Sequence, residues 1–459
     1  MSKQVKFQTP TGMHDILPED QFLYERIWRV VDDVAKFYGF GKIDTPVVED
    51  AALYEKGTGM ATDIVEKQMY TLKTKGGDML ALRPEFTPGI VRSYIQHGMI
   101  AMPQPVKLYT YGPLFRYEHP QAGRFRQFHQ VDFEVFGEQS AALDAQIVQI
   151  FYIILKELKF SHLIIEVNSI GDSQCRPYYK KLLANYLRPR QNSLCADCRR
   201  RIRENPLRTL DCKEEKCQRV RAQAPQIIDH LCEECKSHFK SLLEFLDEAD
   251  LPYHLDPYLV RGLDYYTKTV FEIYSEKPAE AIKEAAQKGA SLSPRLRESE
   301  AGDPLGRGEE TVQRSALVGG GRYDGLVKLL GGKDVPASGA AAGVERIISL
   351  MKEMQLVPLP AEGLAKIFLA QLGDLPKKKS LKLLEEFRKA KIQIAESLGR
   401  DSLRTQLARA DKLGVEYTLI LGQREVIDET IVVRKMDTGE QQIVKLDKVV
   451  EEMKQKLKK

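Results

Sequence analysis

The sequence lacks the features of a membrane or secreted protein. Nowhere in its 459 residues do eighteen apolar residues run together, and the N-terminal segment MSKQVKFQTPTG has no apolar stretch of the signal-peptide kind. Its seven cysteines are an odd number in a long chain, which argues against a disulfide framework. We therefore expect a cytoplasmic protein that contacts no membrane.

A strong excess of one charge is also missing. A net charge of +4 is too small for a general polyanion binder, so any contact with nucleic acid must come from local patches. Lys377 to Lys379 and the C-terminal KQKLKK are candidates, and a solvated helix face or terminus is the alternative for both. The hydrophobic content of 43% is ample for a core, and the length predicts two to three domains.

Residues 275–314 lack aromatic side chains and have few β-branched ones. Such a segment cannot bury enough surface to offset its ordering entropy. We predict a mobile loop here, with a helical piece near Ala279 to Lys288.

What the sequence does contain is most distinctive between Leu114 and Gly137, LFRYEHPQAGRFRQFHQVDFEVFG. The pattern predicts an antiparallel hairpin around a charged loop. On its return strand, a period of two puts polar side chains on one face and apolar ones on the other. The polar set is Gln130, Asp132 and Glu134, and the apolar set is Val131, Phe133 and Val135.

A polar floor of this kind requires partners, because burying carboxylates without them is costly. Arginines 116, 124 and 126 carry planar charged forks suited to phosphate oxygens, whereas Gln130 and Glu134 suit an ammonium group or a ring N–H. The hairpin therefore favours a polar, charged ligand. The alternative is a solvated hairpin face with incidental ion pairs.

Five further segments carry a family resemblance. They are TPVVED at Thr45, RPEFTPGIVRSYIQHG at Arg83, LVRGLDYYTKTVFE at Leu259, GGGRYDGLVKLLGG at Gly319 and GVERI at Gly343. Together, and in this order, they resemble the signature set of bacterial-type histidyl-tRNA synthetases, which are class II aminoacyl-tRNA synthetases. The resemblance runs from about residue 6 to about residue 450.

The resemblance implies an α+β fold built on a six-stranded antiparallel sheet with flanking helices. The class II catalytic core is expected over residues 1–172 and 253–354, and a Cys-rich helical insertion over 173–252. Residues 364–459, a small mixed α/β unit, resemble an anticodon-binding domain. The helix and strand that end at Pro46 match the motif that builds the dimer interface in the family, so a homodimer is implied.

The implied activity is ATP-dependent ligation of L-histidine to tRNA(His) through histidyl-adenylate, with Mg²⁺ accompanying ATP. Two other readings are the non-catalytic regulatory subunit of ATP phosphoribosyltransferase and a regulatory RNA-sensing module. The regulatory subunit typically lacks the C-terminal domain and degrades the RGLDYY segment, both of which are present here.

By the same resemblance, Arg116 and Arg261 are the catalytic residues, on the α-phosphate and the substrate carboxylate. The ATP-binding set is Arg116, Arg124, Phe128 and Arg346. A salt bridge to Asp264 is the structural alternative for Arg261. The glycine-rich GGGRYDG lacks the ending of a phosphate-binding Walker motif, so its glycines are expected to let a strand and a turn pass close beneath the ligand.

A neutral imidazole offers one donor and one acceptor, so a selective pocket should present a carboxylate and a hydroxyl. The resemblance gives these roles to Glu134 and Tyr266. The whole histidine-binding set is Glu85, Thr87, Arg116, Gln130, Glu134, Arg261, Tyr265 and Tyr266. Two residues depart from the family pattern: Phe86, which stands in place of a glycine, and Asp132, which either faces the pocket or pairs with an arginine.

Six of the cysteines have the clustered spacing of thiolate metal ligands. Cys195 and Cys198 are followed by Cys212 and Cys217, and then by Cys232 and Cys235. We predict a structural Zn²⁺ held by Cys195, Cys198, Cys212 and Cys217, with Cys232 and Cys235 as alternative ligands. Ordinary reduced thiols are the other interpretation.

In the last domain, KIFLAQLG and VEYTLILG are typical of buried strands, and TIVVRKM with QQIVKL predicts a hairpin. Between them, Leu403, Leu407, Ala410 and Leu413 fall on one helical face. Ser402 is placed to cap the start of that helix, and Gly414 its end.

Overall fold

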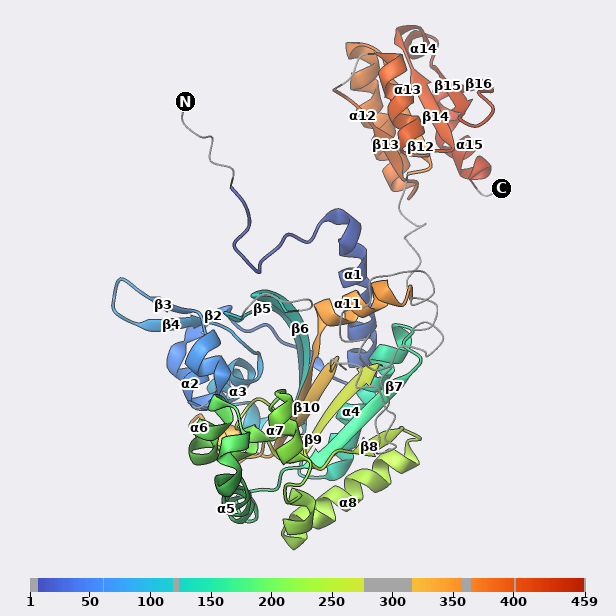
Figure 1. The fold of residues 1–459 in the computed structure, drawn as a ribbon. Helices are drawn as coiled ribbons and strands as arrows, with labels where there is room; N and C mark the ends of the chain where they lie inside the picture. Colours follow the sequence, from blue (N-terminus) through green and yellow to red (C-terminus); the bar gives the residue numbers. More distant parts are fainter. Residues whose placement is uncertain are drawn as a thin grey trace, which may run out of the picture. The chain divides into compact units, whose positions relative to one another are not determined.

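The computed structural model describes residues 7–60, 62–118, 124–275, 316–356, 365–399 and 402–457 (Figure 1). The chain divides into two compact units, Met1–Val357 and Pro358–Lys459. The loop predicted over 275–314 and its helical piece lie outside the described residues, apart from Ser275. No helix in the described ranges is long and apolar enough to cross a membrane.

An eight-stranded sheet forms the centre of the first unit. Its spatial order is β1 (Gly41–Lys42), β5 (Val106–Phe115), β6 (Gln127–Phe136), β11 (Ala337–Gly343), β10 (Val318–Arg322), β9 (Thr267–Ser275), β7 (Leu163–Ser169) and β8 (Tyr253–Leu255). The six central strands are antiparallel, as the resemblance implied, while short β1 and β8 add parallel edges. β9 begins only at Thr267, so Leu259 to Tyr266 is a loop rather than part of a strand.

The predicted hairpin is β5 and β6, in antiparallel register from Val106–Phe136 to Phe115–Gln127. Its apolar face joins a hydrophobic cluster with the helices α1 (Pro18–Phe37), α4 (Ala141–Glu157), α8 (Glu233–Glu248) and α11 (Val344–Glu353). The period-two prediction is therefore confirmed for the core side. α1 has Pro18 in its first turn, where the N–H that proline lacks would have no helical partner.

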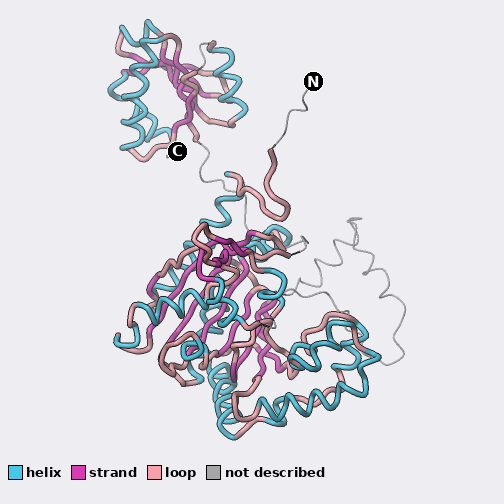
Figure 2. Tube along the Cα trace, turned by 90° about the vertical axis from the view of Figure 1, so that its left-hand side faces the viewer, coloured by secondary structure: helices cyan, strands magenta, loops and turns pink. Residues whose placement is uncertain are grey.

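The insertion does not form a separate core. Its buried Leu183 and Cys198 belong to one hydrophobic cluster with Phe86 and Tyr265 of the sheet-bearing part. Among the described residues, the remaining α-helices of this unit are α2 (Ala51–Thr58), α3 (Thr87–Gln96), α5 (Arg176–Leu187), α6 (Ala196–Glu204), α7 (Glu215–Arg221) and α10 (Leu326–Leu329). Figure 2 shows the strands in the middle of this unit, with helices outside them.

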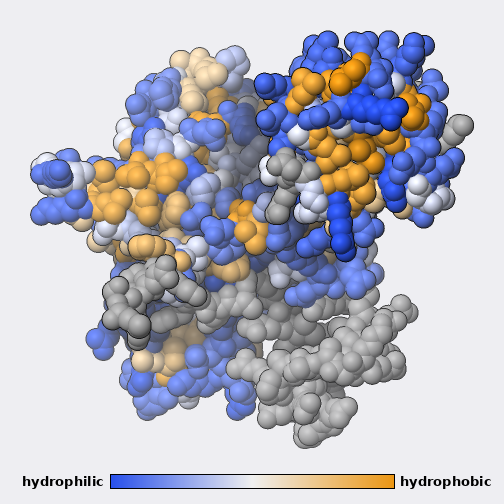
Figure 3. Space-filling view, turned by 90° about the horizontal axis from the view of Figure 1, so that it is seen from above, coloured by the Kyte–Doolittle hydropathy of each residue, from blue (hydrophilic) through white to orange (hydrophobic). Residues whose placement is uncertain are grey.

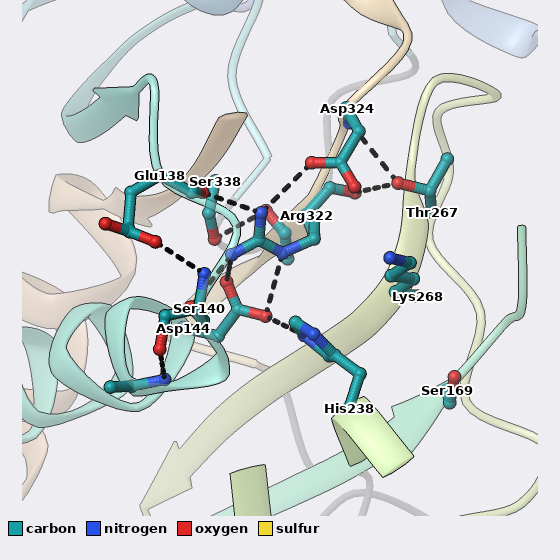
Figure 4. Close-up of polar contacts among 12 residues, drawn as sticks. Glu138, Ser140, Asp144, Ser169, His238, Thr267, Lys268, Arg322, Asp324 and Ser338 are labelled. Atoms are coloured by element: carbon teal, nitrogen blue, oxygen red, sulfur yellow. Dashed lines mark hydrogen bonds and ion pairs between the residues drawn. The ribbon is translucent and has the colours of Figure 1, made fainter. Parts of the chain in front are cut away.

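A buried ion cluster fastens β10 to α4 and α8 (Figure 4). Arg322 is fully buried and donates to both carboxylate oxygens of Asp144, at 2.8 and 3.1 Å. Nε2 of His238 lies 2.8 Å from Asp144 Oδ2. Burial raises the pKa of Asp144, but the Arg322 charge, with hydrogen bonds from His238 and Arg322, outweighs burial and brings the pKa to about 2.

A small second sheet projects from this unit, in the order β2 (Val48–Asp50), β4 (Met79–Leu82) and β3 (Thr71–Lys73). Figure 3 shows hydrophobic surface beside the hydrophilic tip of the β3–β4 hairpin, at the left of the view. Leu72 and Met79 of this hairpin are exposed, as are Val47 and Val48.

The second unit has a five-stranded sheet in the order β13 (Ile394–Glu396), β12 (Ile367–Gln371), β14 (Tyr417–Leu421), β15 (Thr430–Lys435) and β16 (Gln441–Lys445). Its helices are α12 (Asp374–Lys389), α13 (Leu403–Lys412), α14 (Gln423–Ile427) and α15 (Val449–Lys456). The four predicted strands are confirmed, and β13 was missed because it has only three residues.

The predictions made for helix α13 from its sequence pattern are only partly correct. Ser402 stands at its N-cap but makes no side-chain capping bond, so that prediction was wrong. Gly414 follows the helix with a left-handed φ of 66°, as a C-terminal glycine should. The buried polar residue of the helix is Gln406, which pairs with the backbone of Gln371.

Candidate active site

One cavity of about 360 Å³ opens on the polar face of the central sheet, a volume in the range of small-molecule sites. All the predicted substrate residues line it. They are Glu85, Thr87, Arg116, Arg124, Phe128, Gln130, Glu134, Arg261, Tyr265, Tyr266 and Arg346. They come from the start of α3, the β5–β6 hairpin, the loop before β9 and the start of α11. The fold thus brings residues 85 to 346 to one place.

Glu134 lies on the pocket floor and is almost fully buried. Thr87 Oγ1 donates to its Oε1 at 2.6 Å, and the hydroxyl of Tyr323 donates to its Oε2. Gly339 faces Glu134 across β6 and β11, where a Cβ would collide with the carboxylate. Burial raises the pKa of Glu134 to about 7, against the opposing effect of the two hydrogen bonds.

Glu85 is a second buried carboxylate beside the first turn of α3. It accepts a hydrogen bond from Thr58 Oγ1 at 2.5 Å and one from the Tyr265 hydroxyl at 2.8 Å. Burial raises the pKa of Glu85, while Thr58 and the nearby Arg116 act in the opposite direction. Its two oxygens are therefore fixed in position by neutral donors.

Two alternatives were open for Asp132, that it faces the pocket or that it pairs with an arginine. It faces the pocket, which it lines beside Glu134. Its Oδ2 is buried and has no hydrogen-bond partner among the described residues. Burial, followed by the charges of Glu134 and Glu85, holds the pKa of Asp132 well above its usual range.

The other side of the pocket is basic. Arg116, Arg124, Arg261 and Arg346 all line it. Burial lowers the pKa of Arg346, and the charges of the other three arginines add to the effect. Such an accumulation of cations favours a polyanion.

Two of these arginines are held by backbone oxygens. Arg116 donates from Nε to Pro84 O at 2.9 Å, and its guanidinium lies 5.2 Å from the centre of the Phe128 ring. Arg346 donates to Ala316 O at 3.1 Å. These bonds position each fork and leave its remaining donors for a ligand.

Arg261 does not form the salt bridge to Asp264 that was its structural alternative. It pairs instead with Glu272 of β9, and Asp264 accepts from Asn205 at 2.8 Å. Gly319 lies directly beneath the guanidinium, where any Cβ would collide with it. This close approach fits the expected use of the glycine-rich segment.

Phe86 lines one edge of the cavity but is otherwise packed into the hydrophobic core. It is 1% exposed, belongs to the cluster that contains Tyr94 and Leu114, and lies 4.5 Å under the guanidinium of Arg83. The hydrophobic core therefore accommodates the ring of Phe86, which stands where the family pattern has glycine.

Sequence reasoning missed several residues that contact the predicted ones, among them Tyr323, Thr58 and Glu272. Tyr323 stands in the GGGRYDG segment, which was interpreted only as close-packed backbone, and its position inside that motif was a usable signal. Thr58 and Glu272 gave none, because their partners lie 27 and 11 residues away.

The cysteines fall into two groups. In the first, the Sγ atoms of Cys195, Cys198, Cys212 and Cys217 all lie within 4.8 Å of one another. Cys232 and Cys235 lie elsewhere, in a second group with Asp172 and Cys175. Of the open alternatives, the structure thus assembles the first four cysteines.

Comparisons with known proteins cover nearly the whole chain. A family model described as Histidyl-tRNA synthetase matches residues 12–286, and one described as Anticodon binding domain matches residues 367–456. A Dehalococcoides mccartyi protein named histidine--tRNA ligase is 41% identical, over 98% of this chain and all of that protein. A protein of the same name from Acetivibrio thermocellus is 38% identical, over 97% of this chain.

A solved structure, that of apo S. aureus histidyl-tRNA synthetase, is also similar. It is 32% identical with a TM-score of 0.74, and the match covers 97% of this chain and 99% of that one. A Bacillus halodurans structure titled as an ATP phosphoribosyltransferase regulatory subunit/histidyl-tRNA synthetase shares the fold at 18% identity and a TM-score of 0.59.

Proposed function

Since this chain belongs to the histidyl-tRNA synthetase family, we propose that its pocket binds histidine on the acidic floor and ATP on the arginine side. The protein is an ATP-dependent histidine–tRNA ligase that acts through histidyl-adenylate. The regulatory-subunit alternative is disfavoured, because relatives named as ligases match the chain over nearly its full length.

The single observation that carries the residue roles is that one cavity joins the buried carboxylates of Glu85, Asp132 and Glu134 to a group of arginines that includes Arg116, Arg124, Arg261 and Arg346. Histidine brings an imidazole and an ammonium group to the carboxylates, and its own carboxylate faces the arginines. Glu134 accepts from the imidazole N–H, and Tyr266 donates to the other ring nitrogen. Glu85, Thr87, Gln130 and Tyr265 surround the amino end.

The arginines then serve the reaction. A carboxylate oxygen of histidine attacks the α-phosphorus of ATP, the bond to the β-phosphate oxygen breaks, and pyrophosphate leaves with that electron pair. Arg116 and Arg261 neutralise the two anions as they meet. Arg124 and Arg346 bind the outer phosphates, Phe128 stacks on the adenine, and Mg²⁺ accompanies ATP.

Histidine-dependent exchange of pyrophosphate into ATP tests this assignment. We expect exchange with histidine and background rates with the other amino acids. A purified protein that binds histidine and ATP but gives no exchange would contradict the catalytic roles. Exchange with other amino acids would contradict the roles of Glu134 and Tyr266.

We assign tRNA recognition to residues 364–459, because an anticodon-binding family model covers most of them. The catalytic core is assigned to 1–172 and 253–354 and the insertion to 173–252, although helices of the insertion share the core's hydrophobic cluster. Charging of tRNA places the protein's work in the cytoplasm.

A homodimer fits the exposed apolar side chains near the segment that ends at Pro46. Phe37 is 83% exposed at the end of α1, and Val47 and Val48 are also exposed. Sedimentation should give twice the chain mass of 52.2 kDa. A monomer at micromolar concentration would contradict the dimer.

A structural zinc at Cys195, Cys198, Cys212 and Cys217 is the last part of the proposal. Cys195 Sγ and Cys212 Sγ are 3.8 Å apart, which matches the edge of about 3.8 Å expected for a ZnS₄ tetrahedron. Backbone N–H groups of Cys195 and Cys198 point at Cys217 Sγ and Cys195 Sγ, at 3.2 and 3.4 Å. Serine at both Cys195 and Cys198 should remove one zinc per chain; unchanged zinc content would refute the site.

A further inference from the structure

The seventh cysteine, Cys175, belongs to the second group, which spacing alone did not reveal. Asp172 and Cys175 stand between the end of β7 and the start of α5, while Cys232 is the N-cap of α8 and Cys235 lies in its first turn. The four ligand atoms lie within 4.8 Å of one another, although Cys175 and Cys235 are 60 residues apart in the chain. The fold therefore brings two helix starts together at these four side chains.

The distances between these atoms are those of a coordination tetrahedron. With Zn–S near 2.3 Å and Zn–O near 2.1 Å, the S···S edge is about 3.8 Å and the S···O edge about 3.6 Å. Cys175 Sγ lies 3.8 Å from Cys235 Sγ and 3.5 Å from Asp172 Oδ1. Cys232 Sγ lies 3.8 Å from the same Asp172 oxygen.

The surroundings hold these ligands in place. The N–H groups of Gln174 and Cys175 donate to Asp172 Oδ1 at 2.9 and 3.3 Å, and the N–H of Asp172 points at Cys175 Sγ at 3.4 Å. Gly171 has a left-handed φ of 64°, and a Cβ there would collide with Cys175 Sγ. Hydrogen bonds to ligating atoms of this kind orient the ligands of a metal site.

The group of four ligand residues is only partly buried, so a metal ion can reach it from solvent. Cys175 and Cys235 are buried, whereas Asp172 and Cys232 are partly exposed. Three thiolates and one carboxylate in tetrahedral array suit Zn²⁺ better than a hard, oxygen-seeking cation such as Mg²⁺. We propose that Asp172, Cys175, Cys232 and Cys235 form a second zinc site, independent of the first because the two groups share no residue.

The second site also supports the histidine-binding loop, on the assumption that the proposed role of Tyr266 is right. Arg176, next to Cys175, donates to the carbonyl of Tyr266 at 2.8 Å. The carbonyl of Gly171 accepts from the N–H of Lys268 at 2.8 Å. Zinc bound here therefore positions the Tyr265–Tyr266 segment from behind, as a structural element.

Zinc analysis of the full chain, purified without chelators, tests the site. We expect two zinc ions per chain. The variant with Cys232→Ser and Cys235→Ser should retain one, and so should the variant with serine at Cys195 and Cys198. Removing all four cysteines should leave none. A Cys232/Cys235 variant with the zinc content of the unaltered protein overturns the second site and leaves the first untouched.

A less disruptive variant tests the second site even if the serine variants do not fold. Chelator titration of the unaltered protein should release zinc in two steps. Asp172→Asn replaces the anionic ligand and should move only the weaker step, by about tenfold or more in chelator concentration. Asp229→Asn, the same change at an exposed position of the insertion outside both cysteine groups, is the matched control. The proposal is overturned if zinc is released in a single step and Asp172→Asn does not shift the chelator concentration at which that step occurs.

Kinetics test the support of the loop separately. Loss of the second zinc should raise the KM for histidine several-fold and change the KM for ATP little. If the Cys232/Cys235 variant loses one zinc without any change in the KM for histidine, the positioning role is wrong. If no variant or unaltered protein catalyses exchange, the proposed function fails while the zinc count still decides the site.

Discussion

The hydroxyl of Tyr323 donates a hydrogen bond to Oε2 of Glu134, 189 residues earlier in the chain. Thr87 donates to the other oxygen at 2.6 Å, so the carboxylate is held at both ends. Tyr323 follows Arg322, which is anchored in the buried cluster with Asp144. The buried ion cluster and the proposed histidine pocket are therefore joined through two adjacent residues of the glycine-rich segment, Arg322 and Tyr323.

Replacing Tyr323 with phenylalanine should raise the KM for histidine about tenfold, because a hydrogen bond to a charged group contributes about 1.5 to 3 kcal/mol. The ring contacts with Tyr265 and Phe136 remain in the variant. Steady-state exchange kinetics measure the effect. Tyr94→Phe removes a hydroxyl that lies near Gln104 outside the pocket, and it should leave the KM unchanged.

Glu134→Gln should abolish a pH effect on histidine binding. Because the pKa of Glu134 is raised to about 7, the carboxylate gains its charge as pH rises from 6 to 8, and histidine affinity should increase over that range. The glutamine side chain of the Glu134→Gln variant does not ionise, so its contribution to histidine affinity should not change with pH. Titration of the substrate's own imidazole is common to both proteins, so their difference isolates Glu134. Parallel pH profiles for the two would contradict the pocket assignment.

The hairpin was predictable because its information is local. A period of two along β6 indicates which side chains enter the pocket, and β5 and β6 are consecutive strands that pair in antiparallel register. The Tyr323–Glu134 contact required β10 and β11 to be placed between distant segments. No local pattern contains that pairing. The second cysteine group was missed for the same reason, since Asp172 and Cys175 meet Cys232 only through tertiary structure.

Arg261→Ala should slow adenylate formation by about 10²-fold or more, the scale expected for removing one preorganised charge from a developing anion. The variant also leaves Glu272 without its charged partner, so Glu272→Gln combined with Arg261→Ala separates the two effects. The double variant should be no faster than the single one. Arg92→Ala, which breaks a pair with Glu49 outside the pocket, is the control. Wild-type exchange by Arg261→Ala would make Arg261 a structural residue.

The Asp144 pair should make stability depend on pH in a narrow acidic window. Its pKa is about 2 in the folded protein and about 3.9 when unfolded. A depressed pKa stabilises the fold above the unfolded value, and this contribution, about 2 to 3 kcal/mol, is lost as pH falls from about 4 to about 2.

Asp144→Asn should therefore lower the Tm of the protein at pH 7, and the difference from the unaltered protein should shrink below pH 4. Removing the carboxylate breaks a buried pair and leaves Arg322 with Asp324 as its remaining carboxylate partner, so the cost should be at most about 3 to 5 kcal/mol, the value expected for an uncompensated buried charge. Calorimetry at pH 7, 5 and 3 measures the difference in Tm between Asp144→Asn and the unaltered protein. Asp334→Asn, in an exposed pair with Lys328, should have almost no effect. A Tm difference for Asp144→Asn that is equal at all three pH values would contradict the ionisation argument.

Deleting residues from about 362 onward should separate the two halves of the reaction. Every residue that lines the pocket precedes position 347, and the first unit contains its own hydrophobic clusters. The second unit likewise has its own clusters around Leu369 and Phe368, so neither unit needs the other to bury its core. Histidine-dependent pyrophosphate exchange should therefore persist in the truncated protein. Charging of tRNA should fall steeply, because the anticodon contacts are lost while the acceptor end is still presented to the pocket. Filter assays of charging at limiting tRNA measure the loss, and a truncated protein that charges tRNA at full efficiency would show that the C-terminal unit has another task.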